Sequence, residues 1–212
     1  MLPLPDKTNA KVVDRGPVDA LEKEWVKQAL QGDQAAFSKL VSAYSGRIFA
    51  VALRILGDRG EAEDMTQDIF VVIFKSLNQF RGDSKLSTWI YRVAKNRCLN
   101  RLQFLKRRHV GMHKDIHDPI VENRAFVSAK TPDALKRLET QDLSTLLEAH
   151  LRLLPDDQRI LIVLRDLQSQ SYDDIAKIME LPLGTVKSKI HRARSALSKS
   201  LGPVLRPQEP LS

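Results

Sequence analysis

The sequence predicts an all-α fold of two small helical domains joined by a flexible linker, with a helix-turn-helix in the second domain. Apolar residues recur at helical spacing through residues 21–106 and again through residues 134–203. Between these stretches, residues 107–133 lose that period. Residues 1–20 and 204–212 are expected to form a flexible amino-terminal extension and a flexible tail.

Three helices are predicted in the first domain. The first has apolar side chains at the gaps that place them on one buried face: Phe37, Leu40, Val41, Tyr44, Ile48, Val51, Ala52 and Ile55. Gly57 and Asp58 end it. In the second helix, residues 69–74 alone would also suit a buried strand. The helical period continues on both sides of them and no turn residues bound them, so we expect a helix.

The third helix, from about Leu86 to Leu105, is both amphipathic and basic. Its apolar face repeats every four residues, at Leu86, Ile90, Ala94 and Cys98. Between Ser84 and Lys114 the chain has nine lysines and arginines and no acidic residue. This surface therefore suits a polyanion.

The linker interrupts any helix with Gly111, Pro119 and Pro132. As a flexible coil of about 27 residues it has a root-mean-square span of roughly 30 Å and an extended limit near 90 Å. We expect such a tether to let two modules contact separate stretches of DNA.

A helix-turn-helix is predicted between Ser171 and Leu197. Ser171 and Asp174 have capping-box spacing, in which the hydroxyl and the carboxylate accept from free N–H groups at a helix start. Pro182 and Gly184 then favour a tight reversal. The inward residues of the first helix are expected to be Tyr172, Ile175, Ala176 and Met179. The second helix has one apolar stripe, formed by Val186, Ile190, Ala193 and Leu197.

The second helix is otherwise cationic. From Leu181 to Gln208 there are six lysines and arginines and no acidic residue. A basic run alone is often only a solvated face. On the second helix of a helix-turn-helix, however, such residues reach phosphates and guanine edges in the major groove of DNA.

Composition limits the remaining possibilities. The chain has 212 residues, a formal charge of +8 and a pI near 9.7, which favours nucleic acid or an anionic membrane as partner. No stretch approaches the ~18 apolar residues that span a bilayer, and the amino end lacks a signal-peptide core, so we expect a cytoplasmic protein without stable membrane insertion. Cys98 is the only cysteine, and we expect it to be buried.

No metal or cofactor is expected. His109, His113 and His117 stand four apart, as ligands on one helix face would. Gly111 interrupts the segment and no carboxylate or cysteine set completes a site, so an accidental spacing in the linker is the favoured interpretation. The chain also has no phosphate-cradling glycine loop and no nucleophile elbow, so we expect no enzyme.

Several stretches together resemble the extracytoplasmic-function (ECF) sigma factors of bacterial RNA polymerase, in the sigma-70 family. GDQAAFSKLVSAYSGRIFAVALRILGD, AEDMTQDIFVVIF and FRGDSKLSTWIYRVAKNR resemble region 2 of that family, and LPDDQRILIVLRDLQSQSYDDIAKIMELPLGTVKSKIHRARSAL resembles region 4. They cover about two thirds of the chain, in the family's order. The resemblance implies a subunit that directs promoter recognition, promoter melting and transcription initiation in response to a stress or envelope signal.

The resemblance implies three sets of site residues. The core polymerase would bind Asp64, Gln67 and Asp68, an acidic stripe whose alternative role is to stabilise the helix dipole. The −10 element, including the melted non-template strand, would bind Asn78, Phe80, Arg81, Lys85, Arg92, Lys95, Asn96 and Asn100, whereas Trp89 is expected in the core. The −35 element would bind Thr185, Lys187, Ser188, Lys189, Arg192 and Arg194.

The base specificity of the second helix is left open. Lys187 and Lys189 stand where relatives commonly have arginine, and lysine lacks the planar fork that reads guanine. The resemblance also implies an anti-sigma factor as partner. The main rival hypothesis is a helix-turn-helix regulator that binds a palindrome as a dimer, without polymerase.

Overall fold

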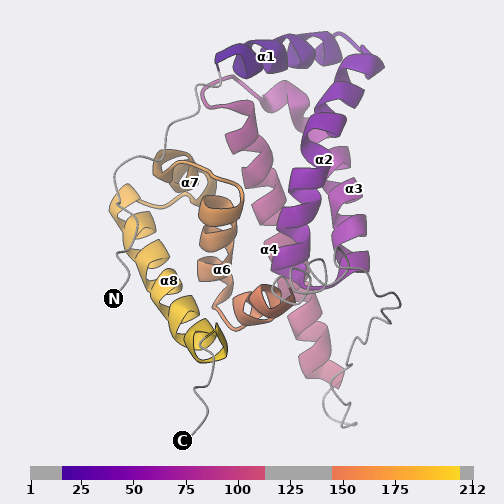
Figure 1. The fold of residues 1–212 in the computed structure, drawn as a ribbon. Helices are drawn as coiled ribbons and strands as arrows, with labels where there is room; N and C mark the ends of the chain where they lie inside the picture. Colours follow the sequence, from indigo (N-terminus) through magenta and orange to yellow (C-terminus); the bar gives the residue numbers. More distant parts are fainter. Residues whose placement is uncertain (1–15, 113–144, 206–212) are drawn as a thin grey trace, which may run out of the picture.

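The computed structural model describes residues 16–112 and 145–205, and the regular elements within those ranges are helices (Figure 1). The predicted all-α fold is confirmed. His113, His117 and most of the predicted linker lie outside the described residues, as do most of the predicted extension and tail.

The first domain is built from α1 (Gly16–Leu30), α2 (Gln34–Leu56), α3 (Arg59–Ser76) and α4 (Leu86–Met112), with a 3-10 turn, η1 (Leu77–Gln79), after α3. Helices α1, α3 and α4 all pack against α2. The largest side chains of the shared core are fully buried: Leu40, Tyr44, Ile48, Ile55, Ile69, Ile73 and Ile90. The apolar periodicity predicted this core.

Local signals set the break between α2 and α3. Gly57 follows α2 with a positive φ of 80°, and its N–H donates to the carbonyl of Leu53. Asp58 then caps α3, because its carboxylate accepts from the N–H of Glu61 at 2.8 Å. The segment that also suited a strand lies inside α3, so the prediction of a helix there is confirmed.

The second domain contains a helix over residues 145–152, then α6 (Asp156–Ile162), a π-helical turn η2 (Val163–Leu167), α7 (Tyr172–Met179) and α8 (Leu183–Leu205). The hydroxyl of Ser171 caps α7 as predicted and accepts from the N–H of Asp174 at 3.0 Å. Val186, Ile190 and Ala193 are buried, which confirms the apolar stripe of α8.

The turn between α7 and α8 differs from the prediction. Glu180, rather than Gly184, takes the left-handed conformation, with φ of 56°, and Gly184 lies in the first turn of α8. The N–H of Leu181 donates to the carbonyl of Ala176 at 3.1 Å, so the end of α7 is closed by backbone hydrogen bonds. The reversal is therefore completed before Pro182.

Helix α4 extends beyond the predicted end of the first domain, to Met112 rather than residue 106. Lys106, Arg107 and Arg108 are good helix formers, and the Lys106 ammonium also binds the carboxylate of Asp156 in the second domain at 2.6 Å. The part of α4 that continues past the predicted end therefore follows directly after Lys106, which contacts the second domain.

The two predicted domains pack against each other, an arrangement that the sequence pattern did not indicate. Helix α7 lies against α4, and α6 and η2 contact α2 (Figure 1). One apolar core contains buried residues of both domains. Two arginines of the second domain also donate to carbonyls at the carboxyl end of α2, Arg159 to Ile55 at 2.9 Å and Arg152 to Gly57 at 2.6 Å. Cations are favoured at this end of a helix.

Candidate functional surfaces

The residues predicted to bind core polymerase lie together on α3. Asp64, Gln67 and Asp68 are exposed and line a hollow between α3 and α4, which we call the acidic hollow. Its remaining lining residues are Glu61, Met65, Arg97, Asn100 and Arg101.

The basic side of the acidic hollow is fixed by ion pairs. Arg101 binds Glu61 through two hydrogen bonds, of 2.6 and 2.8 Å. Arg97 lies 3.7 Å from Asp68, with both side chains well exposed, so this pair is worth at most about 1 kcal/mol. Asp64 and Asp68 thus remain accessible to a cationic partner.

Two apolar residues that the sequence prediction omitted continue this surface. Val71 and Phe74 are half or more exposed; Val71 follows Asp64 by seven residues, about two turns, and lies on the same side of α3, whereas Phe74 follows by ten and lies roughly 80° further around the helix. The Phe74 ring contacts Phe37 edge-on, with centroids 5.0 Å apart. The spacing of Val71 from Asp64 could have revealed it in the sequence.

Three of the residues predicted to bind −10 DNA lie on the side of α4 that faces the second domain. Thr88, Arg92 and Lys95 on α4, with Lys85 directly before its first residue, form a stripe that we call the α4 stripe. Arg92 donates two hydrogen bonds to the carbonyl of Lys177 in α7, at 2.8 and 3.1 Å, and lies 3.8 Å from the carboxylate of Glu180. The second domain therefore occupies donors that were predicted for DNA.

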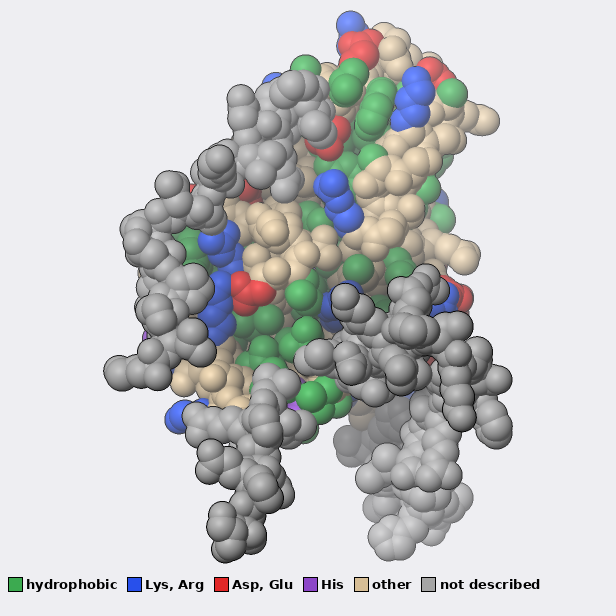
Figure 2. Space-filling model, viewed as in Figure 1, with side chains coloured by type: hydrophobic (Ala, Val, Ile, Leu, Met, Phe, Trp, Pro, Cys, Tyr) green, Lys and Arg blue, Asp and Glu red, His purple; other side chains and the backbone are tan. Residues whose placement is uncertain are grey.

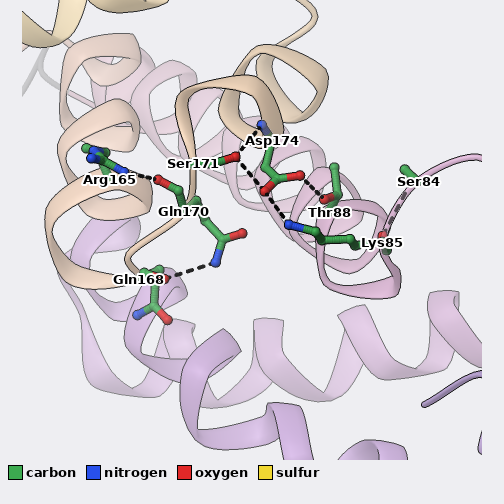
Figure 3. A network of polar contacts seen from close by, with 8 residues as sticks. All are labelled: Ser84, Lys85, Thr88, Arg165, Gln168, Gln170, Ser171 and Asp174. Atoms are coloured by element: carbon green, nitrogen blue, oxygen red, sulfur yellow. Dashed lines mark hydrogen bonds and ion pairs between the residues drawn. The ribbon is translucent and has the colours of Figure 1, made fainter. Parts of the chain in front are cut away.

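Asp174 of α7 is the centre of this contact (Figure 3). Its carboxylate accepts from the Lys85 ammonium and the Thr88 hydroxyl, both at 3.1 Å, and from Ser171 at 2.6 Å. Burial acts to raise the pKa of Asp174, but the hydrogen bonds from Ser171, Lys85 and Thr88 hold it below its ordinary value. The carboxylate is therefore charged. It accepts a hydrogen bond from Ser171 at the start of its own helix, and it binds Lys85 and Thr88 at the start of α4.

Lys95 is covered as well, since only 7% of its surface is exposed. Burial lowers the pKa of its ammonium, partly offset by the nearby carboxylate of Glu180. One turn earlier, the buried Tyr91 donates from its hydroxyl to Gln168 of the second domain at 2.9 Å. Neither residue offers its polar group freely to a nucleic acid in this arrangement.

The remaining residues predicted for −10 DNA are more open. Asn78 and Arg81 are exposed in and after the turn that follows α3, and Asn96 is exposed on α4. Phe80 is half-buried and packs against the ring of Trp89, with centroids 5.6 Å apart. Asn100 lies apart from this group, in the acidic hollow.

The predicted −35 residues lie in the first half of α8. Lys187, Ser188 and Arg192 are exposed, whereas Thr185 is half-buried and its carbonyl accepts from Ser188. They point away from the hydrophobic side of α8, which packs on α6 and α7. The exposed face of α8 is therefore free of the first domain.

Two cations of α8 are held by carboxylates of their own domain. Lys189 binds Asp157 at 2.5 Å, and Arg194 forms a two-bond ion pair with Asp166. The hydrogen bond from Lys189 outweighs burial and lowers the pKa of Asp157. Basic and acidic side chains accordingly lie beside each other on the second-domain part of the surface in Figure 2.

The structure also bears on the predictions about the cysteine, metal sites and membrane spans. Cys98 is fully buried, and burial raises the pKa of its thiol to about 12. Among the described residues, histidines, cysteines and carboxylates form no group of three that could hold a metal ion. No helix within the described ranges is long and apolar enough to cross a membrane.

Comparison with known proteins identifies the family to which both domains belong. Residues 40–108 match the model of sigma-70 region 2, and residues 144–197 match the model of sigma-70 region 4. The sigma-H factor of Pseudomonas aeruginosa is 36% identical over 192 residues, covering 87% of this chain and 96% of the relative. The chain belongs to the ECF family of RNA polymerase sigma factors.

Two further relatives, both named as ECF sigma factors, match over a similar part of the chain. The ECF sigma factor SigW of Bacillus subtilis is 32% identical, covering 87% of this chain and 98% of the relative, and the sigma-E factor of Escherichia coli K12 is 34% identical, covering 85% and 94%. Among solved structures, CnrH in complex with the cytosolic domain of CnrY has a TM-score of 0.62 at 22% identity, covering 86% of this chain and 98% of that one. RpoE of Bartonella quintana in complex with the anti-sigma factor NepR gives 0.60 at 22%, covering 80% and 98%.

Proposed function

We propose that this ECF sigma factor brings core RNA polymerase to its promoters, reading the −35 element with α8 and reading and melting the −10 element with the first domain. The observation that carries the proposal is that both conserved sigma regions occur in order on one chain, each with its own basic helix. A separate acidic surface is available for a protein partner.

For the polymerase we propose the acidic hollow, extended by Val71 and Phe74. Exposed carboxylates at Asp64 and Asp68 repel DNA but complement a cationic protein surface. Further along α3, the exposed aromatic ring of Phe74 supplies the kind of apolar anchor that dominates binding energy at protein interfaces.

For the −10 element we propose the α4 stripe together with the loop around Arg81. Single-stranded bases bind by stacking on planar side chains and by cations along the backbone. Phe80 is half-buried against Trp89, while Asn78 and Arg81 are exposed nearby in sequence. Lys85, Arg92 and Lys95 would supply the cationic track once α7 no longer covers them.

For the −35 element we propose major-groove contacts from the first half of α8. Lys187, Ser188 and Arg192 are the exposed candidates, whereas Lys189 and Arg194 must exchange a carboxylate for DNA or support the helix through their ion pairs. Thr185 would contact DNA at the start of the helix.

The same proposal makes the chain a non-enzymatic, cytoplasmic protein that acts only as part of the polymerase. We propose an anti-sigma factor as its inhibitory partner and a stress or envelope signal as its trigger. The solved neighbour RpoE of Bartonella quintana was captured with an anti-sigma factor.

The test is whether promoter binding requires polymerase. The purified chain and core polymerase are mixed with promoter-bearing DNA fragments, and binding is measured with and without core. Firm binding only with core supports the proposal. Firm binding of the chain alone to a palindrome, as a dimer, would instead show a conventional helix-turn-helix regulator.

A further inference from the structure

We infer that Asp157 and Asp166 are affinity-limiting residues, which pair with Lys189 and Arg194 and so keep these two cations of α8 from binding the phosphates of duplex DNA. The inference rests on the proposed function of α8 in binding the −35 element. It adds that two carboxylates of the same domain set how strongly this helix holds DNA of any sequence.

The first argument is that the two paired cations lie among those proposed to bind DNA. Helix α8 contains five lysines and arginines and no acidic residue. Among the described residues, carboxylates pair with two of these cations, Lys189 and Arg194, and the other three are exposed. Arg192 follows Lys189 by three residues and Arg194 follows Lys187 by seven, so each paired cation shares a side of α8 with an exposed one. The two acids therefore act inside the proposed DNA surface.

The second argument is the geometry of the two pairs. The ammonium nitrogen Nζ of Lys189 lies 2.5 Å from Oδ2 of Asp157, which stands in the first turn of α6. Arg194 donates to both carboxylate oxygens of Asp166 in η2, from Nε at 3.1 Å and from a second guanidinium nitrogen. An arginine that binds both oxygens of one carboxylate is held in a fixed orientation. Both acids belong to the second domain, so the pairs do not depend on where the first domain lies.

The third argument is that neither cation gains by leaving its carboxylate for a phosphate. Such an exchange replaces one anion by another and leaves an unpaired carboxylate beside the polyanion. Asp157 and Asp166 are both partly exposed, so their charges act on an approaching duplex. The energy of counterion release comes from cations that neutralise phosphates. A pair of zero net charge supplies little of that energy, so the three exposed cations provide most of the electrostatic binding of α8.

The consequence is that α8 binds duplex DNA of any sequence more weakly than its own charge suggests. One phosphate contact contributes about 0.9 to the slope of log affinity against log salt, which amounts to about eightfold in affinity at about 0.1 M salt relative to about 1 M. Contacts to base edges do not depend on the two acids. A larger share of the binding at the −35 element therefore comes from sequence-specific contacts.

Replacing Asp157 by asparagine tests the inference as a gain of binding. Asp157→Asn frees Lys189 with almost no change of shape. Asp173→Asn is the matched control, because Asp173 is an exposed acid of α7 that pairs with none of the described cations, and both variants raise the net charge by one. Combining Asp157→Asn with Lys189→Ala completes a double-mutant cycle, which separates the release of Lys189 from the general loss of a negative charge. Asp166→Asn, which frees Arg194, is an independent second variant if Asp157→Asn is unstable.

Binding of the full chain to a labelled, random-sequence duplex is measured by anisotropy over a salt series, without polymerase. We expect Asp157→Asn to steepen the salt slope by about 0.9 and to bind about eightfold more tightly than the parent chain at about 0.1 M salt. Asp173→Asn should change the slope by less than half as much. In a chain that already has Lys189→Ala, Asp157→Asn should have no larger effect than Asp173→Asn has in the parent.

Three results would overturn the inference: a parental slope in Asp157→Asn, an equal gain in Asp173→Asn, or a gain that persists without Lys189. Lys187→Ala, measured in parallel, separates these results from failure of the proposed function. If Lys187→Ala has a shallower slope while Asp157→Asn matches the parent, α8 binds duplex DNA but Asp157 does not limit it. If neither variant differs from the parent, α8 is not the helix that binds the duplex, and the proposed −35 surface fails as well.

Discussion

The exposed lysine at the start of α8, Lys187, gives the sharpest quantitative prediction for the −35 interface. Lys187 is exposed, whereas Lys189, two residues later, is half-buried and bound to Asp157 of α6. We predict that Lys187 binds a phosphate directly and that Lys189 mainly holds α8 against α6.

The magnitude follows from counterion release. Loss of one phosphate contact makes the slope of log affinity against log salt shallower by about 0.9, so Lys187→Ala costs about three- to fourfold more affinity at about 50 mM than at about 200 mM salt. An exposed lysine outside any buried network leaves stability within about 0.5 kcal/mol. The double variant Lys189→Ala with Asp157→Asn removes a cation and an anion together, and we expect it to change the slope by less than half as much.

The assay is promoter binding by the reconstituted holoenzyme, followed by anisotropy over a salt series. Lys199→Ala is the matched control, because Lys199 is also exposed on α8 but lies three turns further along. The reasoning is refuted if Lys187→Ala has the parental slope, or if the double variant at Lys189 and Asp157 shallows it as much as Lys187→Ala does.

Three further predictions follow from the described contacts. Reversing Asp64 and Asp68 to lysine weakens co-purification with core polymerase at least tenfold but lowers the melting temperature by no more than a few degrees, since both are exposed and the pair of Asp68 with Arg97 is weak; intact co-purification would remove them from the interface. Arg159→Met destabilises the chain by about 3 kcal/mol in urea unfolding, because the buried guanidinium donates to the carbonyls of Ile55, Arg152 and Leu154; a loss below about 1 kcal/mol would contradict this. The lowered pKa of Asp174 stabilises the fold fully above its ordinary value of 3.8 and less as the pH falls through the lower folded value, so Asp174→Asn should flatten the acid limb of a pH–stability curve; an unchanged limb would contradict it.

The helices and the helix-turn-helix were predictable because their signals are local. Apolar period, the Ser171 cap and the Gly57 break each depend on residues within a few turns of one another. The left-handed residue before Pro182 was misassigned because both Glu180 and Gly184 flank the turn, and glycine has the lower cost for a positive φ. A cap closed by backbone hydrogen bonds has no side-chain signature.

The packing of the two domains could not be read from the sequence. The partners of the Asp174 carboxylate lie 86 and 89 residues away, at Thr88 and Lys85. In the sequence, the capping box at the start of α7 is a sufficient reason for an acidic residue at position 174, so it gives no sign of a distant partner. Lys95 is one of many cations in its segment and nothing marks it as buried. Burial of a cation by a distant helix leaves no periodic signal, so the placement of the α4 stripe under α7 is information from the structure alone.

The most direct test of the central claim is transcription by the reconstituted holoenzyme. Core polymerase is combined with the purified chain on genomic DNA, and the 5′ ends of the transcripts are sequenced. The account predicts a defined set of start sites that share two upstream sequence blocks at −35 and −10 and that disappear with the reversed Asp64 and Asp68 variant. Transcripts no different from those of core polymerase alone would contradict it.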